Sequence, residues 1–210
     1  MSDGTDQGPE HFLGFEGLRR GFGRLEVLRD VSGHAAAGEV LLVTGPNGCG
    51  KSTLLRCLAG LVRPQRGTID CRVDRRDLDT AARRRALGFL SPDLELWGEL
   101  TTFENLEFVG RLRRVGPERG AELLDRLGLP HDRPAAALSS GMRQRLRWAF
   151  ALLHRPAVLL LDEPLQNLDA PGRRDVLALL QEHLETGLAV VANPESVDVP
   201  GVERHLELAG

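Results

Sequence analysis

The feature that most constrains this chain is a glycine-rich octapeptide at residues 45–52, whose sequence is GPNGCGKS. It matches the P-loop pattern in full, and it lies between an apolar, strand-like run at 40–44 and a helical pattern that begins at Lys51. Glycines allow the backbone N–H groups of such a loop to surround phosphate oxygens, and the N-terminus of the following helix adds the positive end of its dipole. An accidental glycine-rich turn rarely has both the full pattern and this context. The octapeptide therefore predicts a bound nucleotide.

The polar groups of this loop have distinct expected roles. We expect the Lys51 ammonium to reach the β- and γ-phosphates and to assist catalysis, and the Ser52 hydroxyl to ligate Mg²⁺. Two interpretations of Cys49 stay open: a thiol made reactive by the helix N-terminus, or a small residue at a permissive position. The residues predicted to contact the nucleotide here are Gly45, Asn47, Gly48, Cys49, Gly50, Lys51, Ser52 and Thr53.

Strand-like apolar runs alternate with helical patterns along the chain, which predicts an α/β fold with a largely parallel sheet covered on both faces. The section at about 94–154 contains no convincing strand, so we expect a helical insertion there. The expected strands are 12–18, 40–44, 68–71, 158–162 and 188–192, and the expected helices are 51–62, 103–114, 118–127, 141–154 and 171–185.

Composition limits the setting in which the chain can act. The formal net charge of -3 argues against a nucleic-acid binder, and the arginines at 72–85 are interrupted by aspartates, which favours a solvated helix face or loop. No apolar stretch approaches the roughly 18 residues that cross a bilayer. Three cysteines without metal-like spacing are typical of a reducing cytosol. We expect a soluble intracellular chain whose membrane role, if any, comes through a partner.

A second site is predicted where a buried-strand pattern ends in two acids, in the sequence VLLLDEP at 158–164. Such a strand would deliver Asp162 beside the P-loop at the carboxyl edge of the sheet, where it would hold Mg²⁺ through water. Glu163, one residue later, would face another way and polarise the attacking water as general base. The alternative is a strand capped by acids at its solvent end, but the P-loop earlier in the chain favours the functional interpretation.

The octapeptide LSSGMRQR at 138–145 resembles the signature sequence of ABC ATPases, usually written LSGGQ and followed by a basic helix. The resemblance implies a P-loop NTPase core with a mostly parallel sheet, an antiparallel β lobe and an inserted α-helical subdomain. It implies one ATP-binding domain over 12–208, with the subdomain at about 94–154 and a flexible tail at 1–11. The residues of the signature expected to contact phosphate are Ser139, Ser140 and Gly141.

Other positions extend the resemblance. Phe22 is similar to the aromatic residue that stacks on adenine, although a core residue is the alternative, and Asp169 lies in a segment similar to the D-loop that contacts the opposite subunit. The family arrangement implies a head-to-tail dimer of two ATP-binding subunits, here two identical chains, with each ATP between one P-loop and the partner's signature. It also implies an integral-membrane transport subunit, and hence a cytoplasmic chain held peripherally at the inner face of the membrane.

The chain departs from the family pattern at its two switch loops. Pro92 stands where the family has a glutamine that touches magnesium, so this ligand is missing unless Ser91 or Asp93 replaces it. Asn193 stands where a histidine contacts the γ-phosphate; asparagine can orient a phosphate oxygen but carries no proton near neutral pH. One interpretation is an ATP-binding regulator with little hydrolysis. The other, which we favour, is altered switches with intact chemistry.

These departures, with Ser140 and Met142 in the signature, resemble a small bacterial group identified as ATP-binding subunits of the haem exporter of cytochrome c biogenesis. Leu94, Leu96 and Trp97 could form an apolar groove for the membrane subunit, or Trp97 could belong to the core of the helical lobe. Soluble ABC proteins of translation or DNA repair are an alternative function, but they carry tandem cassettes or long insertions. A P-loop kinase would have no use for the signature segment.

Overall fold

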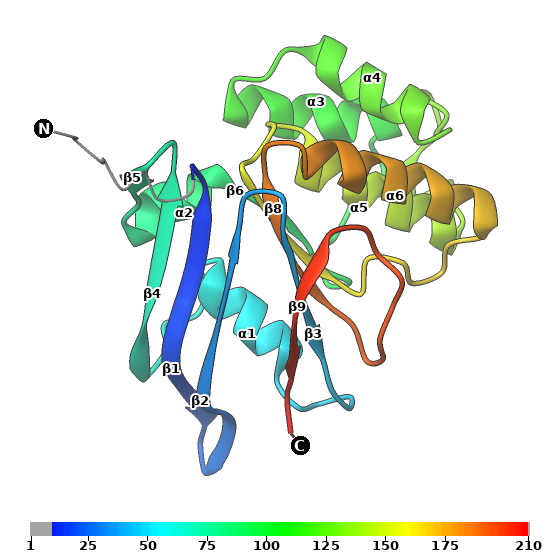
Figure 1. The fold of residues 1–210 in the computed structure, drawn as a ribbon. Coiled ribbons are helices and arrows are strands. Elements are labelled where there is room, and N and C mark those ends of the chain that lie inside the picture. Colours follow the sequence, from blue (N-terminus) through cyan, green and yellow to red (C-terminus); the bar gives the residue numbers. More distant parts are fainter. Residues whose placement is uncertain (1–9, 210) are drawn as a thin grey trace, which may run out of the picture.

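The computed structural model describes residues 10–209, and its centre is a parallel sheet (Figure 1). Within these residues the sheet has the strand order β6-β7-β8-β3-β9, and every neighbouring pair is parallel. Strands β3, β7 and β8 are buried along their whole length, whereas β9 is an exposed edge strand. The strands are β3 Val40–Thr44, β6 Leu87–Leu90, β7 Val158–Asp162, β8 Leu188–Ala192 and β9 Val202–Glu207.

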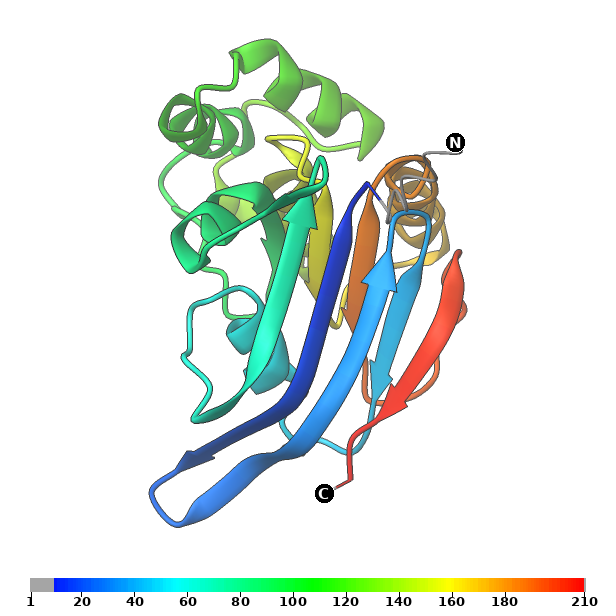
Figure 2. The ribbon, with the colours of Figure 1, turned by 60° about the vertical axis from the view of Figure 1, so that its left-hand side comes forward.

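An antiparallel sheet lies beside it, and helix α1 (Lys51–Leu58) packs between the two sheets (Figures 1 and 2). In the part of the chain that the structure describes, this sheet has the order β2-β1-β4-β5. Leu54 and Leu55 of α1 are buried in one apolar cluster with Leu13 of β1 and Leu160 of β7. The strands are β1 Phe12–Phe22, β2 Leu25–Ala36, β4 Arg66–Val73 and β5 Arg76–Asp77.

Helices cover the opposite face of the parallel sheet. Leu159 and Leu161 of β7 belong to the helical cluster, while Val158 and Leu160 belong to the cluster around α1. This alternation explains the continuous apolar run at 158–161, because a strand covered on both faces has no solvent side. The remaining helices are α2 Thr80–Ala86, α3 Thr102–Arg113, α4 Pro117–Arg126, the 3-10 helix η1 Ala135–Ala137, α5 Ser140–Leu152 and α6 Ala170–His183.

The predicted fold class is confirmed: a parallel sheet, an antiparallel sheet and a helical section at 102–152 are all present. Strands β3, β7 and β8 begin and end where the sequence predicted. Strands β2, β5, β6 and β9 were not predicted. Half of β2 and most of β9 are exposed, so these two strands lack an apolar run. Helix α1 was predicted to continue to residue 62, which is wrong: it ends at Leu58, and Gly60 has a positive φ of 73°.

Residues 1–9 of the predicted tail lie outside the described residues. His11, which was included in that tail, is buried, and its Nδ1 accepts a hydrogen bond of 3.2 Å from the Asp74 backbone N–H. The arginine-rich segment at 72–85 contains β5 and α2, and only Arg83 of α2 is buried. The domain boundaries predicted from the resemblance stay a prediction.

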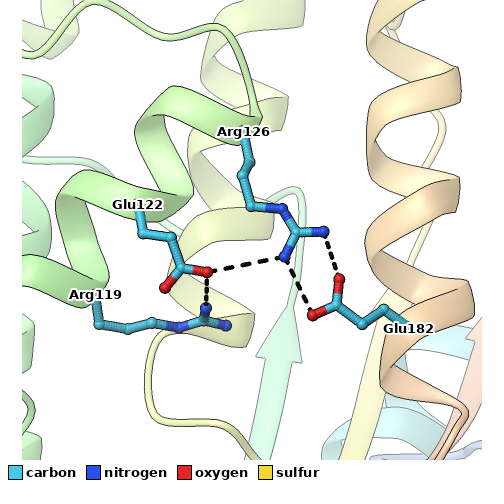
Figure 3. A network of polar contacts seen from close by, with 4 residues as sticks. All are labelled: Arg119, Glu122, Arg126 and Glu182. Atoms are coloured by element: carbon cyan, nitrogen blue, oxygen red, sulfur yellow. Dashed lines mark hydrogen bonds and ion pairs between the residues drawn. The ribbon is translucent and has the colours of Figure 1, made fainter.

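A network of ion pairs joins α4 to α6 (Figure 3). Arg126 of α4 contacts Glu182 of α6, with a distance of 3.2 Å between its NH1 atom and Oε1, and Arg119 contacts Glu122 at 2.7 Å. The hydrogen bond with Arg126 lowers the pKa of Glu182. Because the Glu182 side chain is 55% exposed, such a pair contributes at most about 1 kcal/mol. The network therefore orients α4 on α6 more than it stabilises the fold.

His154 follows the C-terminal end of α5. Burial, reinforced by the charge of Arg113, lowers the pKa of His154 to about 4. The folded protein thus binds this proton more weakly than the unfolded chain, whose histidines have a pKa near 6.5. The corresponding stability is complete above about pH 6.5, and it is lost as the pH falls toward 4.

We predict that His154→Gln flattens the dependence of stability on pH between about 6.5 and 4. The wild type should lose on the order of 3 kcal/mol of unfolding free energy over this window through His154. Burial also lowers the pKa of His183, so part of the slope should remain. Urea unfolding at several pH values measures the effect, with the exposed His34→Gln as control. A slope identical to that of the wild type would contradict the prediction.

Candidate nucleotide-binding site

The P-loop connects β3 to α1, and its glycines are required by conformation and by space. Gly45, Gly48 and Gly50 have positive φ values of 142°, 84° and 108°, a region that favours glycine. A Cβ on Gly45 would lie 2.4 Å from the Leu208 carbonyl oxygen, and one on Gly50 would lie 2.7 Å from Cγ1 of Val27. Larger residues would therefore open the loop.

Lys51 and Cys49 are both buried within the loop. The Lys51 Nζ donates hydrogen bonds to the carbonyl oxygens of Gly45 (2.6 Å) and Pro46 (3.0 Å), which places the ammonium across the loop. Cys49 is 6% exposed, and its Sγ would lie 2.8 Å from a Cβ built on Gly45. This tight packing favours the interpretation of Cys49 as a small residue that fits the loop.

A pocket of about 240 Å³ collects most of the predicted nucleotide contacts in one place. Phe22 is 50% exposed at the end of β1, so the alternative that it is a core residue is wrong. The guanidinium carbon of Arg20 lies 4.6 Å from the centroid of the Phe22 ring. The pocket is lined by Phe22, Val27, Asn47, Gly48, Gly50, Lys51, Ser52, Thr53 and Glu163.

Asp162 ends the buried strand β7 and faces the start of α1. Burial raises the pKa of Asp162, and a hydrogen bond from the Ser52 hydroxyl opposes this rise. A hydroxyl and a carboxylate are the hard oxygen ligands that Mg²⁺ prefers. The two residues predicted to hold magnesium are thus in contact, and their chemistry fits the ion.

Glu163 leaves the strand direction because its backbone is left-handed, with φ of 48°. Its N–H donates to the Ala192 carbonyl oxygen at 2.8 Å, and its carboxylate accepts a hydrogen bond of 2.8 Å from Gln166 Nε2. Asp162 is buried, whereas Glu163 is half-buried and lines the pocket. The two adjacent acids therefore occupy different environments.

The switch-loop residues make local contacts instead of lining this pocket. Asn193 follows β8, its N–H donates to the Val43 carbonyl oxygen at 3.0 Å, and its Nδ2 donates to the Glu195 carbonyl oxygen at 2.8 Å. Asp93 pairs with Arg56, and the Ser91 hydroxyl accepts a 3.3 Å hydrogen bond from the Asp93 N–H. Neither Ser91 nor Asp93 lines the pocket, and a role for either in place of the glutamine stays a prediction.

The signature-like segment begins α5. Ser139 is its N-cap residue, and its Oγ accepts a hydrogen bond of 3.2 Å from the Met142 N–H. Ser139 and Ser140 are exposed, whereas a Cβ on Gly141 would lie 2.8 Å from the Asn167 carbonyl oxygen. Asp169 caps α6 by accepting from the Gly172 N–H at 3.0 Å. These residues lie apart from the 240 Å³ pocket, as a site shared between two chains would require.

Two residues on α5 that contact the loop containing Glu163 were not predicted from the sequence. Gln144 and Trp148 donate hydrogen bonds to backbone carbonyl oxygens of Glu163 and Pro164. Their spacing of four residues places both on one face of a helix, which is the only signal that the sequence offers for them.

The parallel sheet, the P-loop, the acidic strand end and the signature-like helix start together define the ABC class of P-loop ATPase folds. A solved dimer of the cassette MJ0796, bound to ADP and Pi, has this fold with a TM-score of 0.79 and 25% identity, over 93% of this chain and 94% of that one. The family model for ABC transporters matches residues 28–166. The chain belongs to the ABC transporter family.

Curated relatives agree with this assignment. The uncharacterized ABC transporter ATP-binding protein YdbJ of Bacillus subtilis is 36% identical over 187 residues, and the match covers 87% of this chain and 60% of YdbJ. The sulfate/thiosulfate import ATP-binding protein CysA of Bordetella bronchiseptica is 40% identical, over 83% of this chain and 52% of CysA. The chain thus spans only about half to three fifths of these relatives. Among residues 10–209, no helix is long and apolar enough to span a membrane.

We predict that Gly141→Ala destabilises the fold by about 1–3 kcal/mol, because the new Cβ would press on the Asn167 carbonyl oxygen. Alanine is the better helix former by about 1 kcal/mol, so helix propensity alone predicts the opposite sign. Chemical unfolding measures the difference, and Ser140→Ala at the neighbouring exposed position is the matched control. A Gly141→Ala variant at least as stable as the wild type would contradict the close approach.

Proposed function

We propose that this chain is the ATP-binding and ATP-hydrolysing subunit of an ABC transporter. The observation that carries the proposal is the pocket in which an exposed aromatic ring, the P-loop and Glu163 meet. Phe22 stacks on the adenine, and Arg20 braces the ring by a cation–π contact. The P-loop backbone surrounds the phosphates. The Lys51 ammonium gives up its hydrogen bonds to the Gly45 and Pro46 carbonyl oxygens and binds β- and γ-phosphate oxygens instead.

The acidic strand end supplies the groups for hydrolysis. Mg²⁺, when bound with ATP, neutralises charge that develops on the phosphates. Ser52 and Asp162 would hold the ion. Glu163 accepts the proton of the attacking water, and its half-buried position at the pocket wall is suited to that role. Asn193 orients a phosphate oxygen once its side chain leaves the Glu195 carbonyl.

A second copy of this chain completes the site. Ser139, Ser140 and Gly141 lie at an exposed helix N-terminus, which favours bound phosphate through its free N–H groups and dipole. They lie outside the chain's own pocket, so we infer that they contact the nucleotide of a partner chain, with Asp169 at the same interface. The similar MJ0796 cassette is a dimer bound to ADP and Pi, which supports this arrangement.

We predict slow ATP hydrolysis by the isolated chain, because Asn193 and Pro92 weaken the switch loops while the catalytic groups remain. Glu163→Gln should lower turnover by about 10²-fold or more, since a general base contributes 10²–10⁴-fold. ATP binding should persist, and the variant should form an ATP-dependent dimer. Phosphate release and light scattering measure these effects.

Glu195→Gln, at an exposed site on the next loop, is the matched control for this experiment. Turnover that survives Glu163→Gln unchanged would refute the general-base assignment. A wild-type chain that binds ATP but never hydrolyses it would instead support the regulator interpretation.

An apolar groove of about 290 Å³ supports the proposal of a membrane partner. Its walls include Leu61, Leu94, Trp97 and Phe150, with Arg84 and Arg113 beside them. Trp97 is 45% exposed and packs edge-on against Phe108, with ring centroids 4.9 Å apart. This exposure argues against Trp97 as a core residue. A helix of an integral-membrane subunit fits such a groove, and it would hold the chain at the cytoplasmic face of the membrane.

We predict that Trp97→Ala reduces binding of the chain to solubilised membranes at least about tenfold, because a buried aromatic anchor contributes 2 kcal/mol or more to an interface. ATP hydrolysis by the isolated chain should be unchanged. Val202→Ala on the exposed strand β9 is the control. Equal binding by the wild type and both variants would show that the groove is not part of the interface. Co-sedimentation with ribosomes or DNA would favour a non-transport function instead.

The cargo is a separate proposal. The signature, Pro92 and Asn193 resemble haem exporters of cytochrome c biogenesis, whereas the relative CysA is named for sulfate/thiosulfate import. Haem export therefore rests on the resemblance alone. Identification of the membrane protein that co-purifies with the chain, followed by transport of haem in vesicles with that protein, tests it.

A further inference from the structure

The loop after β7 holds Glu163 in a backbone conformation that it would not adopt by itself. Its φ of 48° is left-handed, and Pro164 follows directly. A left-handed conformation costs a residue other than glycine roughly 1–2 kcal/mol, and a following proline restricts the backbone further. Such a conformation persists only where its surroundings impose it. The direction of the Glu163 side chain therefore depends on the contacts of its main chain.

Three hydrogen bonds from α5 add to the bond between the Glu163 N–H and the Ala192 carbonyl oxygen. The side-chain amide of Gln144 donates from Nε2 to the carbonyl oxygens of Glu163 (3.0 Å) and Pro164 (3.1 Å). The indole Nε1 of Trp148 donates to the same Pro164 carbonyl oxygen at 2.9 Å. One amide group thus bridges two successive carbonyls, which fixes the orientation of one peptide plane relative to the next.

Both donors are enclosed by the core. Gln144 is 1% exposed and Trp148 is fully buried. The amide oxygen of Gln144 is in turn held by Arg147 NH1 at 3.4 Å. The Pro164 carbonyl oxygen accepts from both side chains, and the Glu163 carbonyl oxygen also accepts from the Gln166 N–H at 3.2 Å. Removing one side-chain donor would therefore leave each carbonyl with one partner, but it would remove a buried bond that ties the loop to α5. An apolar side chain of similar volume would fill the space but would not orient the loop.

We propose that Gln144 and Trp148 are positioning residues for ATP hydrolysis, because they hold the main chain at Glu163 and Pro164 and thereby aim the Glu163 carboxylate at the pocket. The proposal rests on the function proposed above. Neither residue lines the pocket, so each acts on the reaction only through Glu163. The same hydrogen bonds tie the helix that begins at Ser139 to the catalytic loop of the same chain.

Two variants that remove the donor test the proposal: Gln144→Met, which nearly keeps the side-chain volume, and Trp148→Phe, which keeps an aromatic ring but reduces the volume. Each should lower kcat for ATP hydrolysis at least about tenfold, because displacement of a catalytic group by about 1 Å costs on the order of 10²-fold. The KM for ATP and the Kd for a fluorescent ATP analogue should stay within about twofold of the wild type, since the residues that contact the nucleotide are untouched.

The control is Leu146→Val, at a fully buried α5 position that carries no donor. It should lower thermal stability but leave kcat unchanged, whereas a merely structural role would make kcat follow stability in all three variants. An unchanged kcat in both donor variants, or a parallel loss of stability, affinity and kcat in all three, would overturn the proposal. If Trp148→Phe fails to fold, the kcat, affinity and stability of Gln144→Met alone test the proposal.

Failure of the positioning role is distinguishable from failure of the proposed function. If the wild-type chain does not hydrolyse ATP, or if hydrolysis persists in Glu163→Gln, the proposed function is wrong. The positioning role is then wrong as well, because it rests on that function. If Glu163→Gln abolishes hydrolysis but both donor variants keep a normal kcat, only the positioning role is wrong.

Discussion

The structure depends on the hydrogen-bonded pairing of three buried parallel strands, β7, β8 and β3. Their register sets Ala192 of β8 opposite Asp162 on one side and opposite Val43 on the other. The strands therefore end together, and the two segments that follow β3 and β7 must meet at one edge of the sheet. Because all three strands are buried on both faces, a shift of register would expose apolar residues, so the core that stabilises the fold also places the P-loop beside the acids.

A second constraint comes from the tight contacts between α5 and the loops that follow β7. Gly141 approaches the Asn167 carbonyl, and Gln144 and Trp148 bind the carbonyls of Glu163 and Pro164. Gln144 and Trp148 are buried, so their hydrogen bonds join the helix to the loop within the core. The ion pairs between α4 and α6 are exposed, and they tolerate a displacement better (Figure 3). The helix that follows Ser139 and the loop that contains Glu163 are thus joined by hydrogen bonds within one chain.

The sequence predicted those parts of the molecule that are encoded locally. The P-loop is a contiguous motif, and β3, β7 and β8 are apolar along their whole length, so both could be located without a structure. Strand β9 could not, because its residues are mostly exposed and only its pairing with β3 makes it a strand. The hydrogen bonds of Gln144 and Trp148 join residues 16–20 positions apart, so their partners are fixed by the fold rather than by a pattern. The role of Phe22 was ambiguous for the same reason, because its exposure depends on where the fold places the end of β1.

The placement of the polar groups also bears on the proposal that two chains share each nucleotide. Lys51, Ser52 and Glu163 line the pocket together with Phe22, Val27 and other P-loop residues. The helix N-terminus at Ser139 is exposed, and the Ser139 hydroxyl caps its own helix. A phosphate held only from the P-loop side keeps water on its other side, where charges are screened and the attacking water is not confined. A second helix N-terminus would exclude that water and add positive potential where negative charge accumulates. Under the proposed function, a partner chain would supply this helix N-terminus, and Asn193 would contribute only after its side chain leaves the Glu195 carbonyl oxygen.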